Sequence, residues 1–317
     1  MISTPSHIQK PYAVVIGGAN MDIYGSANED IRLKDSNPGR VTTSPGGVAR
    51  NIAENLAKLE VSCHLIAAVG NDLYGDKIIQ HAKTAGINVE HILRVGDANT
   101  STYLSVLDND NDTMVAISDM DIVDHLTPKK LKSHDKLIKQ AAVIVADTNL
   151  SEEALHYLSD RCFGQPLFVD TVSAAKACRI KPFLKSVHTL KTNRLEAETI
   201  SAMPASKNDN MAQMAKWFHD QGVKRLFITL GPDGVFYSDG DKHGIKTIKP
   251  KTIVNTSGAG DAFVAGLTYG WLEGFNLMNT VQFSLSSANV ALSHRGTINP
   301  EMSVGTVNTF KETNNNE

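Results

Sequence analysis

The chain has 317 residues, 41% of them hydrophobic, and a formal net charge of -3. This length and hydrophobic content are enough for a large buried core, and a charge so near zero gives no electrostatic reason to expect a nucleic acid or an anionic membrane as partner. The three cysteines are far apart and form no C-x-x-C pair, which argues against a disulfide framework and favours a reducing, cytoplasmic location.

Apolar runs typical of buried strands alternate with helical patterns along most of the chain. The predicted strands are 12–16, 61–68, 143–146, 167–170, 189–191 and 227–230. One predicted helix opens after 45–47, and the others cover 74–85, 128–139, 152–160, 259–273 and 277–293. Such alternation predicts an α/β fold with a doubly wound, mainly parallel sheet flanked by helices. The polar end of the chain, 308–317, is expected to fray.

Two segments interrupt the alternation and predict a separate small sheet. Residues 23–44 mix short extended pieces with turn residues and lack helical periodicity. The β-prone runs 102–107 and 113–117 lie on either side of an acidic turn, as in a hairpin. We therefore expect one domain over 1–317, with a discontinuous β-sheet lid at about 23–44 and 99–120.

The segment Asn255–Asp261, of sequence NTSGAGD, runs directly into an apolar helical stretch. Gly258, Ala259 and Gly260 let consecutive backbone N–H groups converge at a helix N-terminus, which predicts a site for an anion such as a phosphate. A carboxylate at Asp261 could then accept the proton of a hydroxyl that attacks this phosphate. The alternative is a tight turn in which Asp261 only complements the helix dipole.

Polar residues after strand ends form a second candidate region, because ligands of α/β sheets bind beyond the carboxyl ends of the strands. Asn20 and Asp22 follow the first predicted strand, and Asn51 lies in the first turns of the helix after Gly46 and Gly47. These side chains could bind substrate hydroxyls. They could also be ordinary turn formers and, for Asn51, a solvent-facing asparagine.

The same pattern recurs further along the chain. Asn193 and Glu196 are three residues apart at the start of a helix, so both can face one site, with Glu196 a candidate magnesium partner through water. A capping box uses the same spacing. Thr229 ends a strand and precedes residues 231–234, for which a β-turn is a sufficient explanation.

Other common cofactor motifs are missing from the sequence. The glycines after the first strand do not form G-x-G-x-x-G, and no G-x-x-x-x-G-K-[ST] occurs, which argues against Rossmann and P-loop sites. The 11 histidines include no H-E-x-x-H motif and no cluster, so a zinc enzyme is not expected.

Together these motifs resemble the ribokinase-like family of carbohydrate kinases over nearly the whole chain. The two family signatures stand at residues 46–51 and 256–261, and its N-x-x-E element at 193–196. Segments 16–22, 35–39 and 192–199 are similar to the branch of the family that phosphorylates pseudouridine at its 5′-hydroxyl with ATP.

The resemblance implies a role for each matched residue. It makes Asp261 the catalytic base and Gly258, Ala259 and Gly260 the anion hole. The residues implied to bind the ribosyl hydroxyls are Asn20, Asp22, Gly46, Gly47 and Asn51. The residues implied to line the ATP site are Asn193, Thr229, Gly231, Gly234 and Asn289. It also implies Mg²⁺ as cofactor, and a β lid through which relatives form dimers.

Potassium activation does not follow from the resemblance. Ribokinases generally have an aspartate, at a position linked to a monovalent-cation site, where this chain has Asn255. An amide carries no negative charge to attract such an ion.

A nucleoside substrate would need partners for its base as well as its ribose, since unpaired polar groups are costly once the lid shuts. The predicted lid offers hydroxyls, a carboxylate and one aromatic face from Thr100, Ser101, Thr102, Tyr103, Ser118 and Asp119. From this set, Thr102 and Asp119 are taken as the candidate base contacts, and Asp119 could accept a ring N–H. Both could equally be ordinary polar residues of a strand surface. Ribose, another sugar or another nucleoside is an alternative substrate, and a non-catalytic sugar sensor is a more distant alternative, because a sensor has no need of Asp261.

Overall fold

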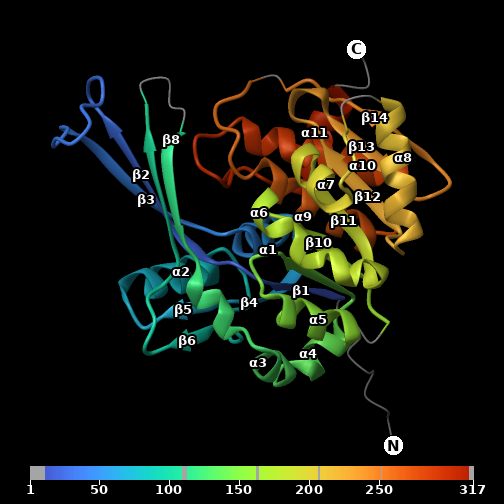
Figure 1. The fold of residues 1–317 in the computed structure, drawn as a ribbon, viewed down its shortest axis with the longest axis horizontal. Helices are drawn as coiled ribbons and strands as arrows, with labels where there is room; N and C mark the ends of the chain where they lie inside the picture. The colour runs from blue at the N-terminus through green and yellow to red at the C-terminus, as the bar shows by residue number, and fades with distance from the viewer. Residues whose placement is uncertain (1–10, 109–112, 162–163, 206–207, 251, 314–317) are drawn as a thin grey trace, which may run out of the picture.

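The computed structural model describes residues 11–313 apart from 109–112, 162–163, 206–207 and 251 (Figure 1). Its main element is an eight-stranded sheet of order β14-β13-β12-β11-β10-β9-β1-β4. Six strands run parallel: β1 (Tyr12–Ile16), β4 (Ser62–Ile66), β9 (Val143–Asp147), β10 (Leu167–Asp170), β11 (Val187–Asn193) and β12 (Arg225–Thr229). At one edge, β13 (Val235–Ser238) and β14 (His243–Lys246) are antiparallel, which the sequence did not predict.

Helices cover both faces of this sheet, so the predicted doubly wound α/β fold is confirmed. On one face lie α1 (Val48–Lys58), α2 (Leu73–Thr84), α9 (Ala259–Leu272), α10 (Leu277–Leu292) and α11 (Val304–Thr313). On the other lie α3 (Pro128–Lys132), α4 (Asp135–Gln140), α5 (Glu152–Asp160), α6 (Ala174–Ala177), α7 (Arg194–Ser201) and α8 (Asn208–Asp220). The strands are continuously apolar because alternate side chains pack into two separate cores.

Short 3₁₀ segments complete the connections of the main body. They are η1 (Asp121–His125), η2 (Cys178–Ser186) and η3 (Gly231–Asp233). The predicted helix 128–139 is interrupted between α3 and α4, and the predicted strand 61–68 is shorter, because β5 (Ala68–Gly70) leaves the main sheet to pair with β6 (Leu93–Val95).

The expectation of fraying over 308–313 is wrong. These residues belong to α11, which is held by the buried Val307 and by Phe310 against the core, while 314–317 lie outside the described residues. Among the residues that the structure describes, no helix is both long and apolar enough to cross a membrane.

The predicted small sheet is present and projects from the main body (Figure 1). It has the order β3-β2-β7-β8, built from β2 (Asn20–Ala27), β3 (Gly39–Gly46), β7 (Thr102–Leu107) and β8 (Thr113–Asp119). The turn at 109–112 of its hairpin lies outside the described residues. Because β2 begins at Asn20, Asn20 and Asp22 are strand residues, not the loop residues that the sequence suggested.

Candidate active site

The NTSGAGD segment opens α9 as predicted. Gly258 caps the helix with φ 82°, a left-handed conformation that favours glycine, and a Cβ there would lie 2.1 Å from the backbone oxygen of Thr297. Ala259 and Gly260 form the start of the first turn, so free backbone N–H groups and the positive end of the helix dipole face the same place. This is the geometry of an anion site.

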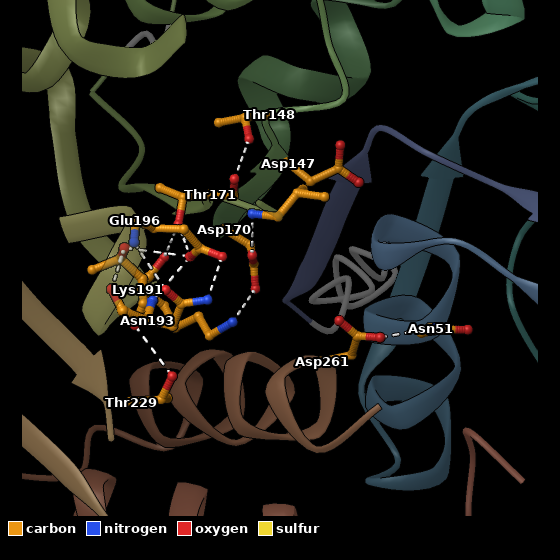
Figure 2. A network of polar contacts seen from close by, with 12 residues as sticks. Asn51, Asp147, Thr148, Asp170, Thr171, Lys191, Asn193, Glu196, Thr229 and Asp261 are labelled. Carbon is orange, nitrogen blue, oxygen red and sulfur yellow. Dashed lines mark hydrogen bonds and ion pairs between the residues drawn. The ribbon is translucent and has the colours of Figure 1, made fainter. Parts of the chain in front are cut away.

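Asp261 lies in that first turn and is 9% exposed. Burial and, to a smaller extent, the Asp170 carboxylate raise the pKa of its carboxyl, which lies at about 8. A hydrogen bond from Asn51 and the charge of Lys191 act in the opposite direction. The Asn51 Nδ2 donates to Asp261 Oδ2 at 2.9 Å, so the two signature segments meet at these two side chains (Figure 2).

Asn20 and Asp22 are joined to each other on β2, and Arg50 interacts electrostatically with both Asp22 and Asp261. The Asn20 Nδ2 donates to Asp22 Oδ1 at 2.6 Å, and a Cβ on Gly46 would fall 2.2 Å from the Asp22 carboxylate. Burial raises the pKa of Asp22 to about 6, against the lowering effects of Asn20 and Arg50. Glycine at position 46 therefore leaves room for a buried carboxylate that can accept hydrogen bonds from hydroxyl groups.

Asp147 fixes the backbone on which these residues sit. Its Oδ2 accepts from the N–H groups of Gly18 and Ala49, both at 2.9 Å. Gly47 caps α1 with φ 98°, and a Cβ there would lie 2.5 Å from the backbone oxygen of Gly18. The end of β1 and the start of α1 are thus tied together, which explains why glycine and aspartate occur at these points.

A cavity of about 260 Å³ lies on the other side of the anion loop. It contains four of the residues predicted for the ATP site together with two residues of the anion loop: Thr229, Gly231, Gly234, Asn289, Ala259 and Gly260. The rest of its wall is mainly apolar and comes from segments 248–256 and from α9 and α10. An apolar cavity with a few polar groups that opens at an anion site is suited to a nucleotide.

The fifth predicted ATP-site residue, Asn193, caps α7. Asn193 and Glu196 form a complete capping box, with Glu196 N donating to Asn193 Oδ1 at 2.9 Å and Asn193 N to Glu196 Oε2 at 2.9 Å. Glu196 also accepts from Asn193 Nδ2 at 2.6 Å and from Thr171 Oγ1 at 2.5 Å. Both oxygens of Glu196 are therefore engaged by the protein itself, and its role toward magnesium stays a prediction.

Sequence reasoning missed Lys191. Its Nζ donates to Asp170 Oδ2 at 3.0 Å and lies 2.9 Å from the point where a Cβ on Gly260 would be (Figure 2). Burial lowers the pKa of Lys191, but Asp170 and Glu196 raise it more, so it is held as a cation next to the anion loop. The sequence does contain a sign of this role. Lys191 ends the predicted strand 189–191, two residues before Asn193, and a lysine is unusual at a core position.

Thr102 and Asp119 lie elsewhere. They pair with each other across β7 and β8, and Thr102 also pairs with Met21, whereas Asp22 pairs with Tyr103. Since side chains alternate between the faces of a sheet, Thr102 and Asp119 are on the face opposite Asp22.

They line a hollow of about 490 Å³ with residues 72–74 and 99–100. The structure therefore does not bring these two predicted base contacts to the Asp22 side. Of the lid residues considered for the base, Tyr103 and Ser118 are the two that share the face of Asp22. Tyr24, on the same face as Asp22, reaches Ser257 of the anion loop through a hydrogen bond, and burial and the nearby Asp22 raise the pKa of Tyr24 to about 12.

A magnesium ion that arrives with a nucleotide needs few ligands from the protein. Within the described part of the chain, no group of three or more metal-ligating side chains is assembled. Mg²⁺ usually keeps several waters and contacts one or two carboxylates plus phosphates, so a ready-made cage is not required. At the predicted cation position, Asn255 Nδ2 donates to the backbone oxygen of Arg295 at 2.8 Å and its Oδ1 accepts from Ser257 N at 2.9 Å.

Known proteins are similar to this chain over nearly its whole length. The model of the pfkB family carbohydrate kinases matches residues 10–303. The chain is 44% identical to the pseudouridine kinase of Escherichia coli (strain K12), over 94% of this chain and 96% of that protein.

Solved structures are similar over the same length. The crystal structure of a protein from Clostridium perfringens assigned as a sugar kinase is 33% identical and covers 96% of both chains, with a TM-score of 0.84. Arabidopsis thaliana ribokinase, solved with ribose and ATP, shares the fold at a TM-score of 0.88 with 21% identity, covering 96% of this chain and 99% of that one. The chain belongs to the pfkB family of carbohydrate kinases.

Proposed function

We propose that the protein transfers the γ-phosphoryl group of ATP to the 5′-hydroxyl of pseudouridine, giving pseudouridine 5′-phosphate and ADP. The observation that carries the proposal is the position of Asp261, at the N-terminus of α9, with the anion loop on one side and Asn51 on the other. A carboxylate in that position can take the proton of a hydroxyl as its oxygen attacks a phosphate held by the loop.

ATP would bind across the anion loop. Its base would occupy the apolar cavity next to Gly231, Gly234 and Asn289, and its terminal phosphates would reach the N–H groups at Gly260. Lys191 adds a positive charge at that point. Mg²⁺, when bound with the triphosphate, would neutralise charge on the phosphate oxygens. Asp170, which is paired with Lys191, and, through water, Glu196 are the carboxylates that would hold it. Potassium is not part of the proposal, because Asn255 is uncharged and already bonded to Arg295.

The ribosyl hydroxyls would meet Asn20, Asp22 and Asn51, which are all buried. Asn51 is bonded to Asp261, and Asn20 is bonded to Asp22. Pseudouridine as substrate rests on the E. coli relative, which covers 94% of this chain. In place of Thr102 and Asp119, the proposal assigns contacts with the base to Tyr103 and Ser118, since these share the face of Asp22.

Replacing Asp261 tests the base assignment. Asp261→Asn should leave the fold and ATP binding intact and lower kcat by about 10²-fold or more, the usual scale for a lost general base. Asp97→Asn, in an exposed turn, is the matched control and should retain full activity. The measurement is phosphorylation of pseudouridine, followed by a coupled assay of ADP release. Near-wild-type turnover of Asp261→Asn would refute the assignment of Asp261 as the base.

A substrate panel tests the nucleoside. Uridine carries the same base joined through nitrogen and has one ring N–H fewer, so a site that pairs this N–H should reject uridine by up to about 10⁴-fold in kcat/KM. Free ribose should be poorer still, because it makes no base contacts. Equal kcat/KM for pseudouridine and uridine, or a preference for ribose, would favour the alternative of a ribokinase or a kinase for another nucleoside or sugar.

We further propose that the protein works as a cytoplasmic homodimer through the outer face of the small sheet. This face, opposite Asp22, exposes Val41, Leu104, Val115 and Ile117 to between 38% and 70%. An apolar patch of this kind on a projecting sheet is suited to burial against a second copy. The sheet would then act as a lid that excludes water from the bound phosphate.

A further inference from the structure

Arg50 is the largest of the fully buried side chains, with 1% exposure. It lies in the first turn of α1, one helical turn before Glu54, which is also buried. A guanidinium in a protein interior is costly unless its hydrogen bonds are satisfied. The structure therefore calls for a reason why arginine occurs at this position.

The guanidinium has four contacts. Its Nη1 donates to the backbone oxygen of Pro45 at 2.9 Å and to Asn51 Oδ1 at 2.8 Å. Its Nη2 is paired with Glu54 and lies 2.9 Å from His81 Nδ1. The Nε has no hydrogen-bond partner within the described part of the chain. Any cationic side chain at position 50 could pair with Glu54. The hydrogen bond to Asn51, in contrast, needs an N–H donor directed at Asn51 Oδ1.

That bond sets the orientation of the Asn51 amide. An amide has an oxygen that accepts and an NH₂ that donates, whereas a guanidinium can only donate. With Arg50 Nη1 on one side, the oxygen of Asn51 must face Arg50, and its NH₂ must face Asp261. Without Arg50 the amide could turn by half a rotation and direct its oxygen at the Asp261 carboxylate, which would disfavour the ionised base.

We propose that Arg50 is a positioning residue for phosphoryl transfer: it holds the Asn51 amide in the orientation that donates to Asp261. The inference rests on the proposed role of Asp261 as base. A purely structural role for the Arg50–Glu54 pair is the rival explanation, and it predicts a loss of stability without a specific effect on catalysis.

The charges around Asp261 predict the direction in which its pKa should move when Arg50 is removed. Asp170 and Asp147 raise the pKa of Asp261, while Asn51 and Lys191 lower it, and Arg50 interacts favourably with the Asp261 charge. Removing Arg50 takes away a nearby cation and frees the Asn51 amide. Both changes raise the pKa of Asp261, so the acid limb of the kcat/KM profile should move to higher pH.

A surface hollow gives access to the arginine from outside. It measures about 450 Å³ and is lined by residues that include Arg50, Glu54, Lys58, His81 and Thr297. A guanidinium ion supplied in solution can therefore reach the space that the Arg50 side chain would vacate. This makes chemical rescue a direct test of the missing donor.

The test compares Arg50→Ala, Asn51→Ala and the double variant, each with a melting temperature. Arg50→Ala should lower kcat by about 10- to 100-fold, which is the scale of loss when a residue that orients a metal-binding side chain is removed from an enzyme. It should also shift the acid limb upward and recover part of its activity with millimolar guanidinium chloride, which should not accelerate the wild type. In the Asn51→Ala background, Arg50→Ala should cause little further loss, because both act through one hydrogen bond.

Two control variants keep the test decisive if Arg50→Ala folds poorly. Glu54→Gln keeps Arg50 and its bond to Asn51, so it should keep the wild-type acid limb. Replacing both members of the buried pair by methionine is often neutral for stability, and this double variant should still show the catalytic defect. Unchanged kcat and acid limb in the folded variants that lack Arg50, or losses that add fully to that of Asn51→Ala, would overturn the inference. Failure of the base assignment itself would appear separately, as an active Asp261→Asn enzyme.

Discussion

Burial acts against the ionised form that Asp261 needs as a base. Desolvation and the Asp170 carboxylate bring the pKa of Asp261 to about 8, well above the ordinary 3.8. The N–H of Asn51 and the cation of Lys191 limit this rise. A base with a pKa near the working pH combines a useful fraction of ionised groups with a strong tendency to accept a proton.

The pH profile follows from this shift. Asp261 must be deprotonated to act, so activity should be lost as the pH falls through its pKa. We expect kcat/KM, measured with both substrates below their KM values, to rise with pH and to have its midpoint nearer 8 than 4. A profile that is flat between about pH 5 and 8 would contradict the raised pKa. Wild-type protein assayed in overlapping buffers is sufficient.

The two faces of the small sheet have different tasks in the proposal. The face with Asp22, Tyr24 and Tyr103 reaches the anion loop at Ser257, whereas Thr102 faces a separate hollow. Adjacent residues of one strand therefore differ in function because side chains alternate between faces.

Tyr103 and Thr102 form a matched pair for testing this assignment. Tyr103→Ala should raise the KM for pseudouridine by about 3- to 10-fold through the loss of an aromatic contact. Thr102→Ala should change the kinetic constants by less than about twofold, as is usual for a surface site. The reverse result would return the base contacts to Thr102, and with it to Asp119.

At the scale of the whole molecule, the exposed apolar face of the small sheet bears on oligomeric state. Ile117→Lys places a charge in the proposed interface and should shift the protein toward a monomer, as measured by sedimentation equilibrium. Leu195→Lys is the matched control, because Leu195 is similarly exposed, at 60% against 63% for Ile117, but lies on α7. A wild-type monomer at micromolar concentration, or a dimer that Ile117→Lys leaves intact, would contradict the proposed interface.

The candidate site is formed only in the folded molecule, from residues that are far apart in the sequence. Lys191 is 140 residues after Asn51 in the sequence, and Asp261 is 210 residues after it. The three residues meet because α1, β11 and α9 converge at one edge of the main sheet. Parallel strands bring their carboxyl ends to that edge, and the helix N-termini of α1 and α9 point at it.

The sequence by itself determined the features that depend on neighbouring residues. The strands β1, β9 and β10 follow from short apolar runs, and the start of α9 follows from the glycines at 258 and 260 with Asp261 in the first turn. The capping box of Asn193 and Glu196 was also legible from its spacing. These are local effects of φ preference, hydrogen-bond capping and side-chain period.

Only the tertiary structure decided what depends on partners far along the chain. A strand pattern shows that two neighbours such as Thr102 and Tyr103 face opposite ways, but not which of them shares a face with Asp22. The pairing register decides this, because Thr102 pairs with Met21 and Tyr103 pairs with Asp22. A charged residue on a helix is expected to face water, yet Arg50 is buried because Glu54, Asn51 and Pro45 supply its partners. Burial, pairing register and the compensation of charge are properties of the assembled fold.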